Sequence, residues 1–178
     1  MQEGIELDPL KAYHYSQLGI TYLFAGKYTE AILTMRKGLS LSPDLVHGHG
    51  VAAVALLLSS KIDEAQAENA LEKGEEFHDQ IETAILHAQG KTTEALAKYT
   101  IFAGKYGSQV PNMVAGLASQ IQLPDESIYW LTKALETKTG GMEYILVDPF
   151  MNNMRGNPRF IEIIERLNFP TKQTESKE

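Results

Sequence analysis

The sequence predicts an all-α fold built from repeated pairs of helices, and three observations lead to this prediction. A short motif recurs at Gly26–Ala31, Ser60–Ala65, Gly90–Ala95 and Leu123–Ser127, its last residue moving by 34, 30 and 32 positions. Apolar residues between the copies recur at helical spacing, and glycine or proline marks most of the boundaries. An unrelated helical bundle would fit the same composition but would predict no fixed period.

Helix pairs are expected at four places along the chain. They run over residues 11–25 and 29–41, 45–59 and 63–77, 80–89 and 92–105, and 110–121 and 125–138. Gly26 is expected to end the first helix in the left-handed conformation, Thr29 to cap the second and Pro43 to stop it. The third pair is short, because its first helix has little room between Phe77 and Gly90, and the stack should be distorted there.

A different pattern follows residue 138. Asp148-Pro149 and Asn157-Pro158 each place a side-chain acceptor before a proline, which is a signal for the start of a helix. A short amphipathic helix after the second signal is expected to close the end of the stack through Phe160, Ile163, Ile164 and Leu167. A strand over Tyr144–Val147 is the weaker alternative, since no second strand is evident.

The expected organisation is one repeat array with two flanking segments. Residues 1–9 are interpreted as the end of a preceding truncated repeat and residues 10–138 as about four units. Residues 139–170 are interpreted as a C-terminal capping segment and residues 171–178 as a flexible tail. On this interpretation the array is a fragment of a longer repeat protein.

Composition argues against several classes of function. The 178 residues contain 16 basic and 23 acidic side chains, a net charge of −7, so the basic footprint of a nucleic-acid-binding protein is absent. No cysteine is present, which removes disulfides, thiolate metal sites and cysteine nucleophiles. The longest apolar run, Val51–Leu58, has eight residues, whereas a membrane span needs about 20, and no signal peptide is visible. We therefore expect no nucleic-acid or membrane partner and a cytoplasmic location.

The first full unit resembles a tetratricopeptide (TPR) repeat. Counting from Ala12, the signature positions of that repeat are occupied by Tyr15, Leu18, Gly19, Tyr22, Tyr28, Ala31, Gly38 and Pro43. The 34-residue period is the length of one such helix–turn–helix unit. The resemblance implies a right-handed superhelix of antiparallel helix pairs, with small residues such as Gly19 and Ala31 where the helices cross.

Residues 110–170 carry a narrower resemblance. The segments Asp125–Glu136, Tyr144–Phe150, Asn157–Phe160 and Leu167–Pro170 are similar to the last repeat and cap of bacterial multidomain regulators. In those proteins the array follows an adenylate cyclase, transcriptional-regulator or protein kinase domain. The resemblance implies a regulatory or interaction module attached to an effector domain, and it transfers no active site.

The TPR resemblance also places a partner-binding groove on the inner face, lined by the first helix of each unit. The first unit contributes Tyr13, Ser16, Ile20, Leu23 and Phe24, and the second His47, Gly50, Val54, Leu57 and Leu58. The last contributes approximately Gln109, Asn112, Gly116, Ser119 and Gln120. The apolar N-terminal part is expected to hold an amphipathic helix or an extended segment of a partner. Alternatively, preceding repeats or a neighbouring domain cover it. Chaperone-tail binding is not expected, because Ser16 and Ile20 occupy the first positions of the lysine/asparagine clamp it requires.

Acidic residues concentrate in one unit. Eight acidic residues and two lysines lie between Lys61 and Glu82. Four of the acids are spaced by four positions and are predicted to form one acidic strip along a helix: Glu64, Glu68, Glu72 and Glu76. A solvated convex face explains such a strip, and a docking strip for a basic partner is the functional alternative.

The sequence offers little catalytic chemistry. No phosphate-binding loop or nucleophile motif is visible, and we expect no catalytic residue, cofactor or metal. His47 and His49 are two positions apart, so on a helix they diverge and are not expected to chelate one ion. We therefore expect a non-enzymatic interaction module with a protein or peptide partner, as the regulatory region of a larger bacterial signalling or transcription protein. A free-standing scaffold that forms a homodimer through its N-terminal end is the alternative.

Overall fold

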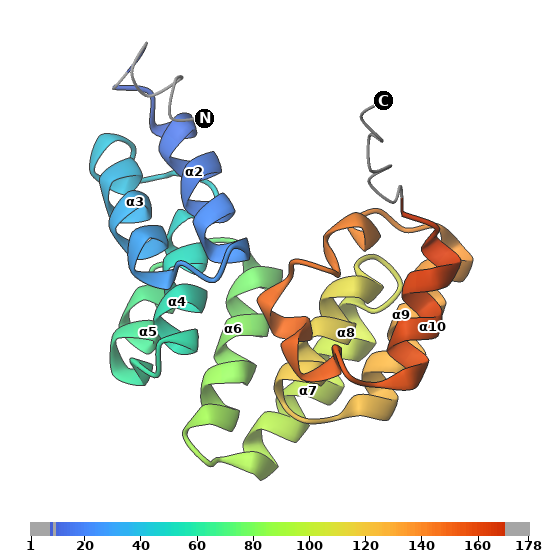
Figure 1. Ribbon diagram of the computed structural model, residues 1–178. Coiled ribbons are helices and arrows are strands. Elements are labelled where there is room, and N and C mark those ends of the chain that lie inside the picture. The colour runs from blue at the N-terminus through green and yellow to red at the C-terminus, as the bar shows by residue number, and fades with distance from the viewer. Residues whose placement is uncertain (1–7, 9, 170–178) are drawn as a thin grey trace, which may run out of the picture.

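The computed structural model describes residue 8 and residues 10–169, and the regular structure in this part of the chain is helical (Figure 1). Helices pack in neighbouring pairs: α2 (Ala12–Phe24) with α3 (Tyr28–Leu41), α4 (Gly48–Leu58) with α5 (Ile62–Asn69), α6 (Glu75–Ala88) with α7 (Thr92–Tyr106), and α8 (Pro111–Gln120) with α9 (Pro124–Thr137). The 3-10 helices η1 (Met142–Tyr144) and η2 (Pro149–Met154) then lead to α10 (Pro158–Leu167). The all-α prediction is confirmed for these residues. The truncated repeat predicted at 1–9, apart from residue 8, and the tail predicted at 171–178 lie outside them.

The same tight turn joins the two helices of each pair. In the first pair the Gly26 N–H donates to the Leu23 carbonyl at 3.0 Å, and the Lys27 N–H donates to the Tyr22 carbonyl at 2.8 Å. The equivalent two hydrogen bonds recur in the other three pairs. Each turn has one residue with positive φ, in chain order Gly26, Ser60, Gly90 and Gln122. These residues are separated by 34, 30 and 32 positions, so the recurring sequence motif corresponds to a recurring backbone structure.

Small residues lie where the helices of the stack approach most closely. The buried residue at the equivalent place in each second helix is, in chain order, Ala31, Ala65, Ala95 and Ser127. A Cβ added to Gly19 would lie 2.9 Å from the Met35 Cε, and one added to Gly38 would lie 3.1 Å from the Tyr15 Cβ. Such distances are shorter than ordinary van der Waals contact, so a larger residue would force the neighbouring side chains to shift.

The second and third pairs depart from the predicted helix boundaries. The helix expected at 63–77 ends at Asn69, and the helix expected at 80–89 begins at Glu75. The short element is therefore the second helix of the second pair and not the first helix of the third. Side chains at this boundary make hydrogen bonds with backbone groups of other segments. The Asn69 Nδ2 donates to the His78 carbonyl at 3.1 Å, and Glu72 accepts hydrogen bonds from two backbone N–H groups.

Two of the three predicted side-chain caps are present. The Asp148 and Asn157 side chains each accept a hydrogen bond, at 2.9 Å, from the backbone N–H two residues later. Thr29 does not cap α3, which begins after Lys27 with no side-chain cap. The strand alternative at Tyr144–Val147 is wrong, because these residues form a 3-10 helix and turns.

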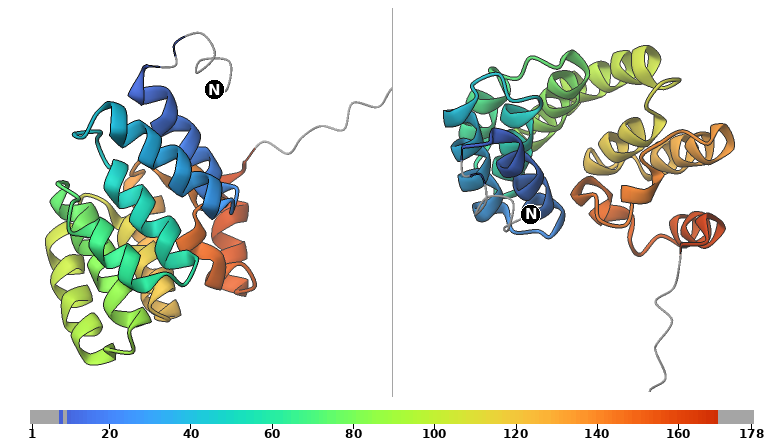
Figure 2. Two further views of the ribbon diagram at one scale, coloured as in Figure 1. Left: turned by 90° about the vertical axis from the view of Figure 1, so that its left-hand side faces the viewer. Right: turned by 90° about the horizontal axis from the view of Figure 1, so that it is seen from above.

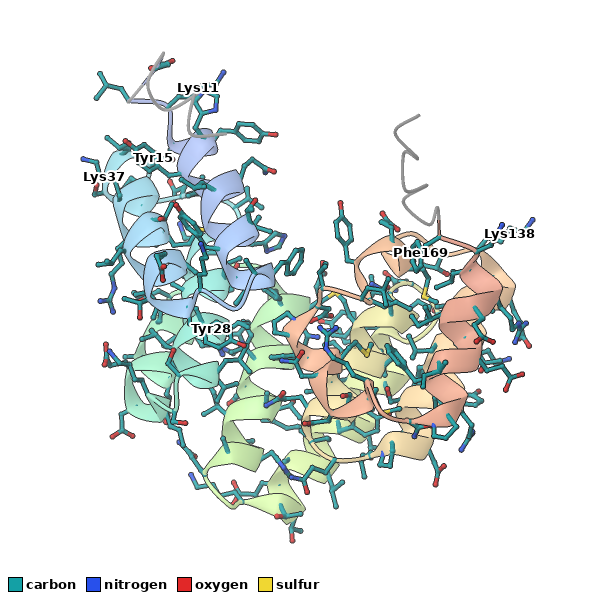
Figure 3. All side chains as sticks on the ribbon, in the orientation of Figure 1. Lys11, Tyr15, Tyr28, Lys37, Lys138 and Phe169 are labelled. Carbon is teal, nitrogen blue, oxygen red and sulfur yellow. The ribbon has the colours of Figure 1, made fainter. Side chains whose placement is uncertain are left out.

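The C-terminal helix packs on the last pair, the position expected of a capping element. Phe160 and Ile163 of α10 are buried in a cluster with Leu131 of α9, and Ile164 and Leu167 pack against it. Figure 3 shows Lys138 and Phe169 at this end of the molecule and Lys11 and Lys37 near the free end of the first pair. Among the described residues, no helix combines the length and apolar character needed to cross a membrane.

The helix pairs follow a curved path that brings the first pair and the segment after α9 to neighbouring positions (Figure 2). The first helices of the pairs, α2, α4, α6 and α8, contact one another in series along the inner side. Across the opening, the ring centroid of Tyr144 lies 5.7 Å from that of Phe24 on α2. Residues after the last pair therefore enclose one end of the inner face.

Candidate partner-binding pocket

A pocket of about 300 Å³ opens on the inner face of the curved stack. Its walls come from all four first helices, α2, α4, α6 and α8, and from the residues at the start of η2. Most of the lining side chains are apolar, which is the usual character of a site for an apolar side chain or a small ligand.

Five of the fifteen residues predicted for the groove line this pocket: Ile20, Leu23, Phe24, His47 and Val54. The other ten do not, and they include Gly50 and all five residues predicted in the last unit. Tyr13 is 58% exposed on the first turn of α2, Ser16 and Leu57 are buried between helices, and Leu58 is half-buried at the end of α4. The structure thus brings together the C-terminal half of α2 and the N-terminal part of α4, and their binding role stays a prediction.

Sequence reasoning missed eight lining residues: Val51, Glu76, Phe77, Gln80, Met113, Asp148, Pro149 and Phe150. Glu76 had been predicted only for the acidic strip, and Asp148 only for a helix cap. Phe77 and Gln80 were missed because the first helix of the third unit was expected to begin at residue 80, whereas α6 begins at Glu75. Met113 of α8 lines the pocket, whereas the predicted groove residues on this helix included Asn112 and Gly116 on either side of it. For Pro149 and Phe150 no local pattern signals the contact, because they reach α2 from more than a hundred positions away in the sequence.

Close packing fixes the Phe77 wall of the pocket. A Cβ added to Gly50 would lie 2.4 Å from the Phe77 ring, so a glycine there lets the ring rest directly on α4. The His47 ring meets the Phe77 ring edge-on, with the two centroids 5.2 Å apart and the planes at 82°. This wall is therefore shaped by a glycine and a histidine from one short segment.

Two carboxylates line the pocket, and among the residues that the structure describes no lysine or arginine does. Burial raises the pKa of Asp148, against the opposing effects of its hydrogen bond from the Phe150 N–H and of the nearby Arg155 charge. Glu76 is exposed, and within the described part of the chain it forms no ion pair. The pocket is therefore an apolar site with an excess of negative charge at its edge.

The predicted acidic strip is wrong as a single helical stripe, because α5 ends before two of its members. Glu64 and Glu68 lie on α5, where the Arg36 guanidinium of α3 is 3.5 Å and 3.8 Å from their carboxylates. The His49 Nδ1 also lies 2.7 Å from the Glu68 Oε1. These two acids therefore link the first pair to the second instead of forming an unpaired docking strip.

Glu72 and Glu76 serve two further purposes. The Glu72 side chain is only 4% exposed and accepts hydrogen bonds from the Gly50 N–H at 2.7 Å and the Gly74 N–H at 2.8 Å. Glu76 lies on the first turn of α6 and lines the pocket. Only Glu76 of the four is thus left for a partner among the described contacts.

One group of side chains in the described residues has metal-ligating geometry. Ligand atoms of His78, Asp79 and Glu82 on α6 lie within 4.8 Å of one another. The Lys98 Nζ is 2.5 Å from the Glu82 carboxylate, and the Tyr106 hydroxyl donates to Asp79 at 3.4 Å. Lys98 and Tyr106 of the same chain therefore already bind both carboxylates.

The two histidines considered at the sequence level face different carboxylates. The His47 Nδ1 lies 3.7 Å from Glu72 Oε1, whereas the nearest carboxylate to the His49 Nδ1 is that of Glu68. This matches the expected divergence of side chains two positions apart.

A partly buried polar network joins the third and fourth pairs. The Tyr99 hydroxyl donates to the Glu126 carboxylate at 3.1 Å and accepts from the Trp130 indole N–H at 3.1 Å. Burial and the Glu126 charge raise the pKa of Tyr99 well above its ordinary value. The hydroxyl therefore stays protonated and acts as a connector between helices.

A scan against protein-family models and a search of curated proteins find no match to this chain.

Proposed function

We propose that the chain is a tetratricopeptide-like array, a right-handed superhelix of antiparallel helix pairs that binds a segment of a partner protein on its inner face. The recurring turn supports this proposal, because four left-handed residues at near-34-residue spacing carry the same two hydrogen bonds. The small buried residues at one equivalent place in each second helix support it as well.

The observation that carries the binding function is the apolar pocket on the inner face. Successive first helices line it, and its volume of about 300 Å³ lies at the lower end of the range for ligand sites. A pocket of that size suits a single large side chain of a partner, and buried anchors of this kind supply much of the affinity of protein interfaces. We assign the pocket no catalytic role and no cofactor.

The resemblance of residues 110–170 to the ends of regulatory arrays supports a more specific proposal. The module belongs to a larger bacterial signalling or transcription protein in the cytoplasm, where binding in the pocket regulates an effector domain. Packing of η2 and α10 on α8 and α9 is consistent with a C-terminal end to the array.

The test is a selection of linear peptides followed by measured binding to matched variants. A random peptide library displayed on phage is selected against the chain, and enriched peptides are titrated by fluorescence anisotropy. Ile20→Arg places a long cation at the pocket wall, and Leu33→Arg makes the same change on α3, where Leu33 is 63% exposed and outside the pocket. Circular dichroism checks that both variants keep their helices.

We expect Ile20→Arg to weaken peptide binding by at least about tenfold and Leu33→Arg to leave it unchanged. Equal binding to both folded variants would contradict the proposal, because the peptides would then bind elsewhere. Failure to enrich any peptide over a selection without protein would also count against it.

Self-association through the N-terminal end is the second candidate, and one observation favours it. Leu10 is 76% exposed and Tyr13 58% exposed, so two large apolar side chains face solvent at the start of α2. Sedimentation equilibrium of Leu10→Glu and Tyr13→Glu tests this candidate: a dimer that both substitutions dissociate supports it, and a monomeric wild type excludes it. Leu23→Glu would not be a clean test of this dimer, because Leu23 is buried and lines the pocket.

A further inference from the structure

We propose that the partner segment presents a large apolar side chain next to a lysine or arginine, and that this cation binds the pocket carboxylates of Glu76 and Asp148. The inference rests on the proposed function of the pocket and names the chemistry of its partner. It begins from the combination of apolar walls with two carboxylates and no lining lysine or arginine.

The walls suit an apolar anchor. Phe24 of α2, Val54 of α4, Phe77 of α6 and Phe150 of η2 all contribute to one pocket. Phe24 and Phe77 are half-buried, so these rings keep exposed surface on the inner face. Burying that surface under a partner's side chain is favourable because it removes apolar area from water.

Glu76 is available to a cation because the described chain leaves it unpaired. Its neighbours on α6 are held internally: Glu75 pairs with Lys105, and Glu82 pairs with Lys98. For Glu76 the described residues provide no such partner, although it lies on the same helix. An unpaired carboxylate beside an apolar pocket attracts a positive group and disfavours a negative one.

Asp148, the N-cap residue of η2, adds a second carboxylate to the pocket lining. Its Oδ1 accepts the Phe150 N–H at 2.9 Å, while its Oδ2 lies over the backbone of Gly116, 3.4 Å from where a Cβ would be. The nearby Arg155 donates to the Leu146 carbonyl and to the Asn152 side chain, so its own hydrogen bonds are directed elsewhere. Burial raises the pKa of this carboxyl, and a bound cation would offset that unfavourable desolvation.

The continuity of the surface favours a chain segment over an isolated small amine. A second pocket of about 210 Å³ adjoins the first and shares Leu23, Phe24 and Pro149 with it. An extended segment can fill the first pocket with its anchor and continue along the second. A small amine would use only one of them.

The experiment uses the enriched peptides of the same selection as probes. Each peptide is resynthesised with its basic residue replaced by glutamine or by glutamate and titrated against the intact chain. Glu76→Gln and Asp148→Asn remove one charge each while keeping side-chain shape, and asparagine can still cap η2. Glu94→Gln, an exposed acid at the start of α7 outside the pocket, is the control with the same change in net charge.

We expect enrichment of lysine or arginine beside an aromatic or branched residue, and a loss of about fivefold to tenfold when glutamine replaces that cation. Glu76→Gln and Asp148→Asn should each reduce this preference, and the double variant should abolish it. Glu94→Gln should leave the preference unchanged.

Three results separate failure of the inference from failure of the proposed function. The first is that peptides without basic residues bind the wild type as tightly as peptides with them, yet fail to bind Ile20→Arg. This result overturns the inference and leaves the proposed function in place. A preference for lysine or arginine that persists in the double variant overturns the assignment to these carboxylates. Binding that Ile20→Arg does not affect overturns both.

Discussion

The Glu72 carboxylate accepts a hydrogen bond from the backbone N–H of Gly50 at 2.7 Å, across 22 positions of sequence. Gly50 lies in the first turn of α4, where N–H groups have no partner within the helix, and His47 provides no side-chain cap. Glu72 therefore caps a helix from another element, and a negative charge at this end also interacts favourably with the helix dipole. The same carboxylate bonds the Gly74 N–H and so ties the connection before α6 to α4.

Replacing Glu72 by alanine should lower the free energy of unfolding by about 1–3 kcal/mol, because two backbone N–H groups lose a buried acceptor. The measurement is urea unfolding followed by circular dichroism. Glu64→Ala is the matched control: its side chain is 49% exposed in a surface ion pair, so its effect should stay within about 1 kcal/mol. Equal effects of the two substitutions would refute the capping role.

The four recurring turns predict two substitutions that raise the stability of the chain and two that lower it. Ser60→Gly and Gln122→Gly should each stabilise the chain by about 1 kcal/mol, because both positions have positive φ, which glycine adopts without strain. Gly26→Ala and Gly90→Ala should destabilise by a similar amount. No atom lies within 4 Å of a Cβ at either glycine, so the cost arises from the backbone alone. Chemical unfolding of the four variants checks the signs, and stabilisation by either alanine would contradict the turn geometry.

Ser127 occupies the place that alanine holds in the other three pairs. Its Oγ is buried, and the described residues provide it with no hydrogen-bond partner. Ser127→Ala should therefore stabilise the chain by about 1 kcal/mol, since it removes an unsatisfied polar atom and raises helix propensity. Ser40→Ala on the exposed face of α3 is the comparison, and its effect should be close to zero because the Ser40 hydroxyl is exposed and bonds locally. Differential scanning calorimetry distinguishes the two. A loss of stability in Ser127→Ala would mean that the hydroxyl has a partner in solution.

Asp148 predicts a pH dependence of stability with a definite sign. Burial raises its pKa in the folded chain above the ordinary value of 3.8, so the folded state binds this proton more tightly than the unfolded state. Its contribution to stability is therefore greatest below that ordinary value and declines as pH rises through the raised pKa. Asp148→Asn keeps the cap and removes the titration. The stability difference between variant and wild type should grow in favour of the variant from about pH 4 towards neutrality. Urea midpoints measured across this range would show a constant difference if the carboxyl were not desolvated.

Local pattern was sufficient for much of the helical architecture, whereas part of the pocket was predicted from the TPR resemblance. The boundaries of α2, α3, α7 and α9 fall within about two residues of those expected, because glycine and proline mark the turns between strongly periodic segments. Ile20, Leu23 and Phe24 were found because the resemblance assigns them groove positions on a well-predicted helix. The boundary between α5 and α6 was missed because the predicted helix ran on through Gly74. The hydrogen bonds of Glu72 in the connection include one from a distant position, Gly50.

The sequence by itself determined that this chain forms paired helices, and it determined the turn within each pair, because turn motifs and helical periodicity are local properties. The tertiary structure alone decided which acids remain free for a partner and which residues close the pocket. Glu72 leaves the helical ladder for N–H groups on α4, and Pro149 and Phe150 meet α2 only because the stack curves. Such contacts depend on the summed geometry of all the helix pairs, and no single segment encodes that curvature.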